Sequence, residues 1–175
     1  MEGLVNEFGH PTYVPFPVIA FRLVLAVIVG GAIGFEREAQ NRPAGLRTHI
    51  LTCVAAAMIA VLGIEITQFE VFEDESIKMD PIRLIEAVTA GVAFLAAGTI
   101  LMARGEVHGL TTGAGMWLAA GLGLACGLGL WQVAILGAVL ALAVLIIIGK
   151  MQKLIDIGDA DKKPVADKAK AASKD

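Results

Sequence analysis

Residues 132–149 read QVAILGAVLALAVLIIIG, a run without any charged side chain that ends at Lys150. Apolar runs of this kind are typical of helices that cross a bilayer, which take about 20 residues. The run lacks the period-two alternation of a membrane β-strand. Four more apolar runs precede it, at residues 16–35, 46–66, 82–103 and 112–130. The sequence therefore predicts an all-α integral membrane protein with a bundle of five transmembrane helices.

The composition agrees with this fold class. Hydrophobic residues make up 57% of the chain and charged residues 18%, with a mean hydropathy of +0.74. Soluble domains are less apolar and more charged, so the composition argues against a soluble enzyme. The net charge of −3 gives no basic excess that would indicate a nucleic-acid partner. The expected partner is the lipid bilayer.

Lysine and arginine are distributed unevenly between alternate sides of the predicted bundle. Eleven lie on one side, seven of them in the tail, and two lie on the other. Basic residues favour the cytoplasmic side, so we expect the N-terminus outside and the C-terminus in the cytoplasm. Residues 1–15 are then a short periplasmic segment, which does not look like a cleavable signal peptide. Residues 16–149 form the transmembrane domain, and residues 150–175 a charged tail that is predicted to be disordered.

The densest polar motif joins the first two spans at their predicted cytoplasmic ends. Its candidate functional residues are Glu36, Arg37, Glu38, Arg47 and Thr48. Three consecutive charges cannot all face one way on a helix, so at least one is expected to turn toward the bundle and to need a partner there. Arg47 is placed to bridge inward to Glu36 or to the loop at residues 104–112. The alternative is a set of interfacial charges that only fixes the topology.

A second polar motif lies on the same predicted side, between the third and fourth spans. It contains Arg104, Thr111 and Thr112. The two threonine hydroxyls either cap the start of the fourth span or line a cavity.

Two charged residues, Arg22 and Glu86, lie within the predicted spans. A charge inside a bilayer is costly, and mutual pairing would relieve part of that cost. Arg22 alternatively extends to the outer interface, or the two residues belong to a proton or ion relay.

Small residues recur at helical spacing. Gly30 and Gly34 permit close approach of another helix, and Gly123 and Gly127 suit either a partner protein or self-association. The cysteines lie in apolar runs without metal-ligand spacing, so packing is their expected role.

No sequence pattern indicates catalysis, a cofactor or a metal. Phosphate-binding motifs are absent, and no nucleophile–base pair is visible. The acidic residues before the third span lack EF-hand spacing and are interpreted as a solvated outer loop. We therefore expect no enzymatic activity.

Four segments together resemble the MgtC/SapB family of bacterial inner-membrane proteins. They are GFERE at residues 34–38, RPAGLRT at 42–48, FLAAGTI at 94–100 and GLTT at 109–112, the last followed by Trp117. The resemblance covers approximately residues 18–148, which is nearly the whole membrane portion.

This resemblance implies a multi-pass inner-membrane protein of the magnesium transport ATPase protein C type, which is not itself an ATPase. It further implies a link to growth at low magnesium and to virulence, and a regulator that modulates another membrane complex such as ATP synthase. The eight residues of the two polar motifs become the expected functional centre. The alternative function is a transporter or channel for an ion or small solute. A homo-oligomer, such as a dimer, is expected.

Overall fold

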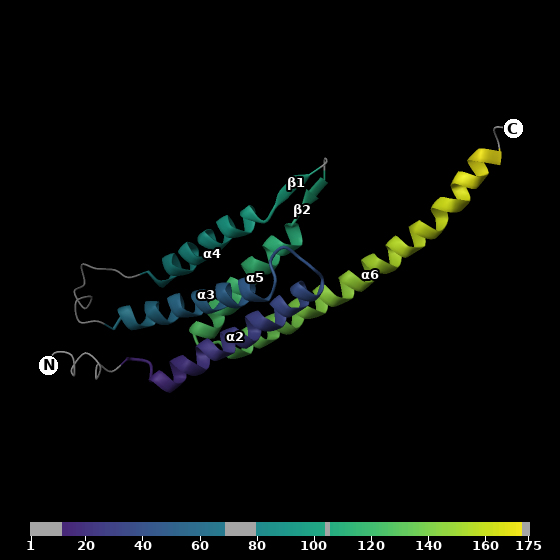
Figure 1. Ribbon diagram of the computed structural model, residues 1–175. Helices are drawn as coiled ribbons and strands as arrows, with labels where there is room; N and C mark the ends of the chain where they lie inside the picture. Colours follow the sequence, from purple (N-terminus) through teal and green to yellow (C-terminus); the bar gives the residue numbers. More distant parts are fainter. Residues whose placement is uncertain (1–11, 69–79, 104–105, 173–175) are drawn as a thin grey trace. The chain divides into compact units, whose positions relative to one another are not determined.

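The computed structural model describes residues 12–68, 80–103 and 106–172. Most of the predicted periplasmic segment, most of the acidic loop and Arg104 lie outside these ranges. The described residues form five helices and one hairpin (Figure 1): α2 Phe16–Ala39, α3 Leu46–Ile66, α4 Pro81–Gly98, β1 Leu101–Ala103, β2 Glu106–His108, α5 Leu110–Gly127 and α6 Trp131–Ala172.

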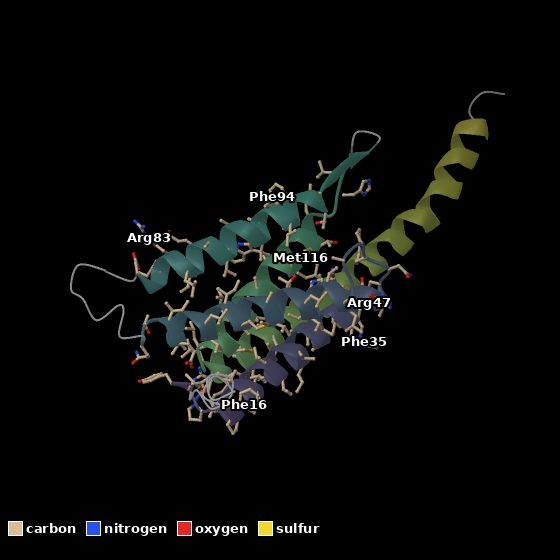
Figure 2. All side chains as sticks on the ribbon, turned by 60° about the vertical axis from the view of Figure 1, so that its left-hand side comes forward. Phe16, Phe35, Arg47, Arg83, Phe94 and Met116 are labelled. Atoms are coloured by element: carbon tan, nitrogen blue, oxygen red, sulfur yellow. The ribbon has the colours of Figure 1, made fainter. Side chains whose placement is uncertain are left out.

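Helix α3 packs against both α2 and α5, and these three helices form the centre of the fold (Figure 1). Their interface consists mainly of small side chains, including the buried Ala26, Ala57 and Ala119. Large apolar side chains such as Phe35 and Phe94 point outward (Figure 2). This distribution is the reverse of a soluble protein. It suits a lipid environment, in which small residues allow close contact between helices.

In the part of the chain that the structure describes, four helical segments are long and apolar enough to cross a membrane: α2, α3, α5 and residues Trp131–Met151 of α6. Helix α4, in the predicted third span, begins at Pro81 with its first turn capped by the Asp80 carboxylate. It ends at Gly98, whereas the predicted span continued to residue 103. The antiparallel hairpin of β1 and β2 follows instead, with Leu101 opposite His108. The fold is therefore all-helical apart from this short hairpin.

The inner face of α4 packs against α5 and α3. Val88 and Val92 of α4 join a buried cluster with Met116 of α5 and Ala60 of α3. Met116 lies on the side of α5 that faces α4 (Figure 2). This packing fixes the start of α5 beside the end of α4.

Helix α5 is continuous in spite of its five glycines, four of which lie against neighbouring helices. The chain divides into two compact units, Met1–Val139 and Leu140–Asp175. In the first unit, the start of α6 packs on α5, with Ala134 fully buried. The backbone of α6 is helical from Trp131 to Ala172. The predicted disorder of residues 150–175 stays a prediction.

Candidate functional site

Among the described residues, four polar or charged side chains are buried: Glu36, Arg37, His49 and Thr112. They come from three different helices, α2, α3 and α5. All four lie where α2 ends and where α3 and α5 begin, which we name the Glu36 end. We call these four residues the polar cluster.

The central contact of the polar cluster is an ion pair between neighbouring residues on α2. Both Nε and Nη2 of Arg37 lie 2.5 Å from Oε2 of Glu36. Gln40, one turn later, donates to Oε1 of Glu36 at 2.5 Å. Glu36 and Arg37 are buried, whereas Glu38 is exposed. The prediction that part of this motif turns toward the bundle is confirmed, and the buried charges are paired as burial requires.

The basic and hydroxyl residues at the start of α3 lie outside the polar cluster. Arg47 is exposed near the end of α2 (Figure 2), so the predicted bridge to Glu36 is wrong. The partner is Arg37 instead, because it follows Glu36 on the same helix and needs no second helix to reach it. Thr48 is exposed, and its hydroxyl donates to the Gly45 carbonyl at 2.9 Å.

Glu38 serves the backbone of the next helix. Its carboxylate accepts a hydrogen bond of 2.8 Å from the backbone N–H of Leu46, the first residue of α3. A negative charge at this position satisfies an N–H group that has no partner within the helix and complements the helix dipole. Glu38 therefore has a capping role.

His49 is the member of the polar cluster that we did not predict as a site residue. Its side chain is fully buried, and Nδ1 lies 2.8 Å from the carbonyl oxygen of Gly45. The other ring nitrogen, Nε2, has no hydrogen-bond partner among the described residues. It faces Gly115 of α5, where an added Cβ would lie 3.1 Å away. The available signal was its position one turn inside an apolar span, since ionisable residues at such positions are functional candidates.

The two threonines of the second motif have different environments. Helix α5 starts after Gly109, whose φ of 90° is left-handed, and no side chain caps the helix. The predicted capping by threonine hydroxyls is therefore wrong, because both threonines lie within the first helical turn. Thr111 is exposed, whereas Thr112 is buried on the face that also carries Gly115.

The two predicted intramembrane charges do not pair. Arg22 donates from Nη1 to the carbonyl oxygen of Gly127 at 2.8 Å, and its guanidinium also lies beside Gly129. Glu86 is exposed on α4. The end of α5 presents carbonyl groups without partners, and a cation at this position satisfies one of them. We name this opposite end of the bundle, where α2 begins and α5 ends, the Arg22 end.

The predicted packing glycines all lie against α3. A Cβ at Gly30 would lie 2.8 Å from the Cβ of Cys53, and one at Gly34 would lie 2.8 Å from the Cα of Leu46. On the other side of α3, a Cβ at Gly123 or Gly127 would collide with backbone carbonyl groups of α3. These glycines therefore close the bundle itself rather than an interface with another chain. Cys53 and Cys126 are free and buried in the same packing.

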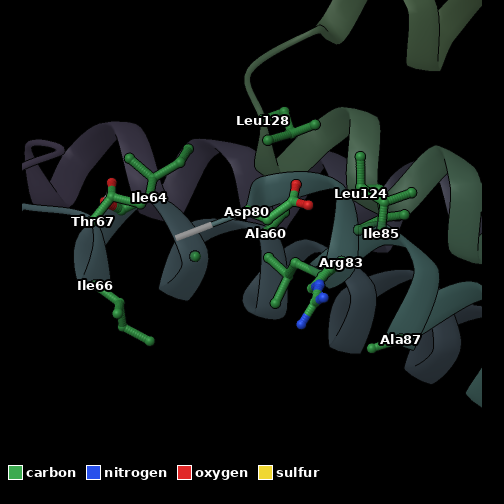
Figure 3. Close-up of a pocket in the computed structure, with 12 residues that line it drawn as sticks. Ala60, Ile64, Ile66, Thr67, Asp80, Arg83, Ile85, Ala87, Leu124 and Leu128 are labelled. Atoms are coloured by element: carbon green, nitrogen blue, oxygen red, sulfur yellow. The ribbon is translucent and has the colours of Figure 1, made fainter. Parts of the chain in front are cut away.

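A separate pocket of about 510 Å³ lies between α3, α4 and α5 toward the Arg22 end (Figure 3). Its walls are mainly aliphatic, including Ile64, Leu84 and Leu124. Asp80 and Arg83 are its charged residues, and Asp80 is already engaged in capping α4. The pocket therefore offers little polar chemistry, and the polar cluster remains the stronger candidate site.

Comparison with known proteins identifies the family. The MgtC family model matches residues 23–154. The Escherichia coli protein named "Putative magnesium transporter YhiD" is 36% identical over 124 residues, which are 71% of this chain and 57% of that protein. Protein SrpB of Synechococcus elongatus is 33% identical over 165 residues, covering 90% of this chain and 89% of that protein. Protein SapB of Bacillus subtilis is 40% identical over 107 residues, which are 61% and 46% of the two chains.

The match with several of these relatives spans about half of their length, and SrpB is matched over nearly its whole length. No solved structure matches the chain. The apolar helices and the family model together make it a multi-pass protein of the bacterial inner membrane. The chain belongs to the MgtC family.

Proposed function

We propose that this protein is a non-enzymatic regulator that modulates another complex of the bacterial inner membrane during adaptation to low magnesium. An ATP synthase is the expected partner, as the family resemblance implies. In this proposal five helices, including α4, cross the membrane, with the N-terminus outside and the C-terminus in the cytoplasm. The chain acts as a homo-oligomer, such as a dimer.

The observation that carries the proposal is the close packing of α2 and α5 against α3. At Gly30 and Gly34 on one side, and at Gly123 and Gly127 on the other, there is no space for even one added methyl group without displacing α3. A hydrated ion is larger than a methyl group, so these interfaces do not leave a solute route at the four positions. This packing favours a protein that acts through its surface.

The surface of α6 supports the same proposal. Within the first unit, the start of α6 exposes large apolar residues such as Val133 and Leu136. Apolar helix faces in a membrane contact lipid or the helices of other proteins. The start of α6 therefore offers a face on which a membrane partner can pack.

Transport by an oligomer is the second candidate function. The polar cluster favours it, because buried ionisable groups in membrane proteins often mark ion or proton pathways. The Escherichia coli relative also carries a transporter name. A pathway of this kind would run between chains, because the interfaces of α3 within one chain are closed by glycine contacts.

Reconstitution into liposomes separates the two functions. We expect liposomes that contain only this protein to take up Mg²⁺ no faster than protein-free liposomes. We expect liposomes that also contain the ATP synthase of the same organism to show a changed rate of ATP synthesis when this protein is added. An unchanged rate would rule out this partner.

Two matched variants show whether any flux comes from the polar cluster. Glu36→Gln alters the buried ion pair, whereas Glu38→Gln alters an exposed carboxylate two residues later on the same helix. Mg²⁺ uptake that is lost in Glu36→Gln and kept in Glu38→Gln would establish transport and refute the regulator proposal.

A further inference from the structure

The Nε2 atom of His49 needs an explanation. It is the one buried side-chain nitrogen or oxygen without a hydrogen-bond partner among the described residues. Such atoms are rare in folded proteins, because an unsatisfied buried polar group costs free energy. The family assignment and the proposed function do not account for it.

The partner of Nδ1 fixes the chemistry of Nε2. A carbonyl oxygen can only accept a hydrogen bond, so the Nδ1 atom that lies 2.8 Å from the Gly45 oxygen carries the proton. In a neutral imidazole the other nitrogen then holds a lone pair. The lone pair of Nε2 is therefore a buried acceptor without a donor among the described residues.

The charged groups around His49 come from one neighbouring helix. Glu36 and Arg37 of α2 are its electrostatic neighbours. Helix α5 presents Gly115 and the neutral Thr112 on the face toward His49. On α3 itself, the nearest charged residue along the chain is Arg47, which is exposed. Among the described residues, Glu36 is therefore the buried anion that can serve as the partner of a charged His49 imidazole.

We propose that Nε2 of His49 is a proton-binding site, and that proton uptake there draws the Glu36 carboxylate away from its present partners. Protonation places a second positive charge beside Arg37 and creates an N–H donor that needs an acceptor. The Glu36 carboxylate, which now holds Arg37 and Gln40, is the available buried acceptor. To accept from His49 it must weaken one of those two contacts.

The expected consequence is local. Arg37 lies in the last turn of α2, Gln40 directly follows that helix, and the loop after Gln40 leads into α3. Loss of either contact loosens the junction between α2 and α3, while the glycine contacts deeper in the bundle remain. The proton thus acts as a ligand that shifts the balance between a closed and a loosened Glu36 end. This inference depends on the geometry of the polar cluster and is independent of the proposed function.

The direct test is a pH titration of the full chain in lipid nanodiscs, followed by the imidazole ¹⁵N signals. The His49 signals are assigned by their absence in His49→Gln. We expect Nε2 of His49 to change from an unprotonated to a protonated signal as pH is lowered from 8 to 4.5, and the Arg37 Nε signal to move with the same midpoint. A His49 ring that keeps one tautomer throughout would overturn the proposal, as would an Arg37 signal that does not follow it.

Two carboxylate variants test whether Glu36 is the acceptor. In Glu36→Gln the buried anion is gone, so we expect the His49 midpoint to move to lower pH, which is a loss of proton affinity. In Glu38→Gln we expect no movement. Equal midpoints in both variants would refute the role of Glu36. If Glu36→Gln does not fold, the unaltered protein provides the test. A shared midpoint of the His49 and Arg37 signals then supports the proposal, and separate midpoints refute it.

Thermal unfolding gives an independent measurement. Acidification should lower the Tm of the unaltered protein by about 2–4 °C more than that of His49→Gln, which cannot take up this proton. His108→Gln is the matched control, because His108 is an exposed histidine on β2. Loss of the pH dependence in His108→Gln, or its retention in His49→Gln, would contradict the proposal.

Discussion

At the Glu36 end a buried carboxylate binds a neighbouring guanidinium, whereas three charged side chains described at the Arg22 end bind the backbone. Arg22 binds the carbonyl at the end of α5, and Glu65 accepts from the backbone N–H groups of Tyr13 and Val14 just before α2. Asp80 caps α4 in the same way. Charges of this second kind have a plain structural purpose, because helix ends expose groups without partners.

The Glu36–Arg37 ion pair does not satisfy backbone groups at a helix end. Both side chains are almost fully buried, and desolvation of two charges can cost as much as their attraction returns. The adjacent His49 adds a polar atom without a partner. The comparison teaches that the charges at the Arg22 end satisfy helix ends, whereas the Glu36 end also buries an ion pair and an unpartnered histidine nitrogen that no helix end requires. This difference makes the Glu36 end the candidate site.

The largest expected effect is that of Glu36→Ala. Removal of the Glu36 carboxylate leaves the Arg37 guanidinium buried without a counter-charge, and the expected loss is about 3–5 kcal/mol of unfolding free energy. Denaturation of the unaltered protein and the variant in mixed micelles measures this loss of unfolding free energy. Glu38→Ala, which removes only a cap, should cost about 1 kcal/mol. Equal losses in the two variants would mean that burial of the pair has no energetic consequence.

Arg22→Ala should have the second-largest effect. It removes a charged hydrogen bond to the Gly127 carbonyl, for an expected loss of about 1.5–3 kcal/mol. Gly129→Ala perturbs the same contact, because a Cβ there would lie 2.7 Å from Nη2 of Arg22 and the φ of 81° is left-handed. In a double-mutant cycle the two losses should be non-additive. Additive losses would show that Arg22 does not act through the end of α5.

Glu65→Ala should cost about 1 kcal/mol, because its carboxylate accepts from two backbone N–H groups that water can partly satisfy. Hydrogen exchange at Tyr13 and Val14 should become faster, while exchange within α3 stays unchanged. Glu86→Ala on the exposed face of α4 is the control and should leave both quantities unaltered. Faster exchange in both variants would argue against a specific role of Glu65.

Arg47→Ala should have the smallest effect, within about 0.5 kcal/mol, as is usual for an exposed residue. The measurement is the same denaturation experiment as for Glu36→Ala. A loss of several kcal/mol would show that Arg47 is the true counter-charge of Glu36, and would remove the distinction between the two ends of the bundle.

Much of the fold follows from local patterns in the sequence. A helix covers most of each of the five predicted apolar runs, and four of the described helical segments qualify as membrane spans. The third run was predicted too long, because residues 101–103 are apolar yet pair with residues 106–108 as a hairpin. Hydropathy does not distinguish a short strand from the end of a helix. The five-span count and the orientation remain predictions.

The candidate site was predicted only in part. Glu36 and Arg37 are buried, as the sequence predicted for at least one of the three consecutive charges. A functional role of this motif stays a prediction. His49 directly follows the RPAGLRT segment, but it was not chosen as a site residue, because the sequence does not show which side of α3 faces the bundle. Arg47 and Thr48 belong to the same motif but lie on the exposed side of α3.

The sequence by itself determined that apolar helices carry this chain through a membrane, since length and hydropathy are properties of each segment alone. The tertiary structure decided which charges meet. Gly30 and Gly34 seat α2 on α3, and Gly123 and Gly127 seat α5 on its other side. These contacts set the rotation of each helix about its axis, and that rotation turned His49 inward and left Arg47 outside. Contacts between residues far apart in the chain cannot be read from any one segment.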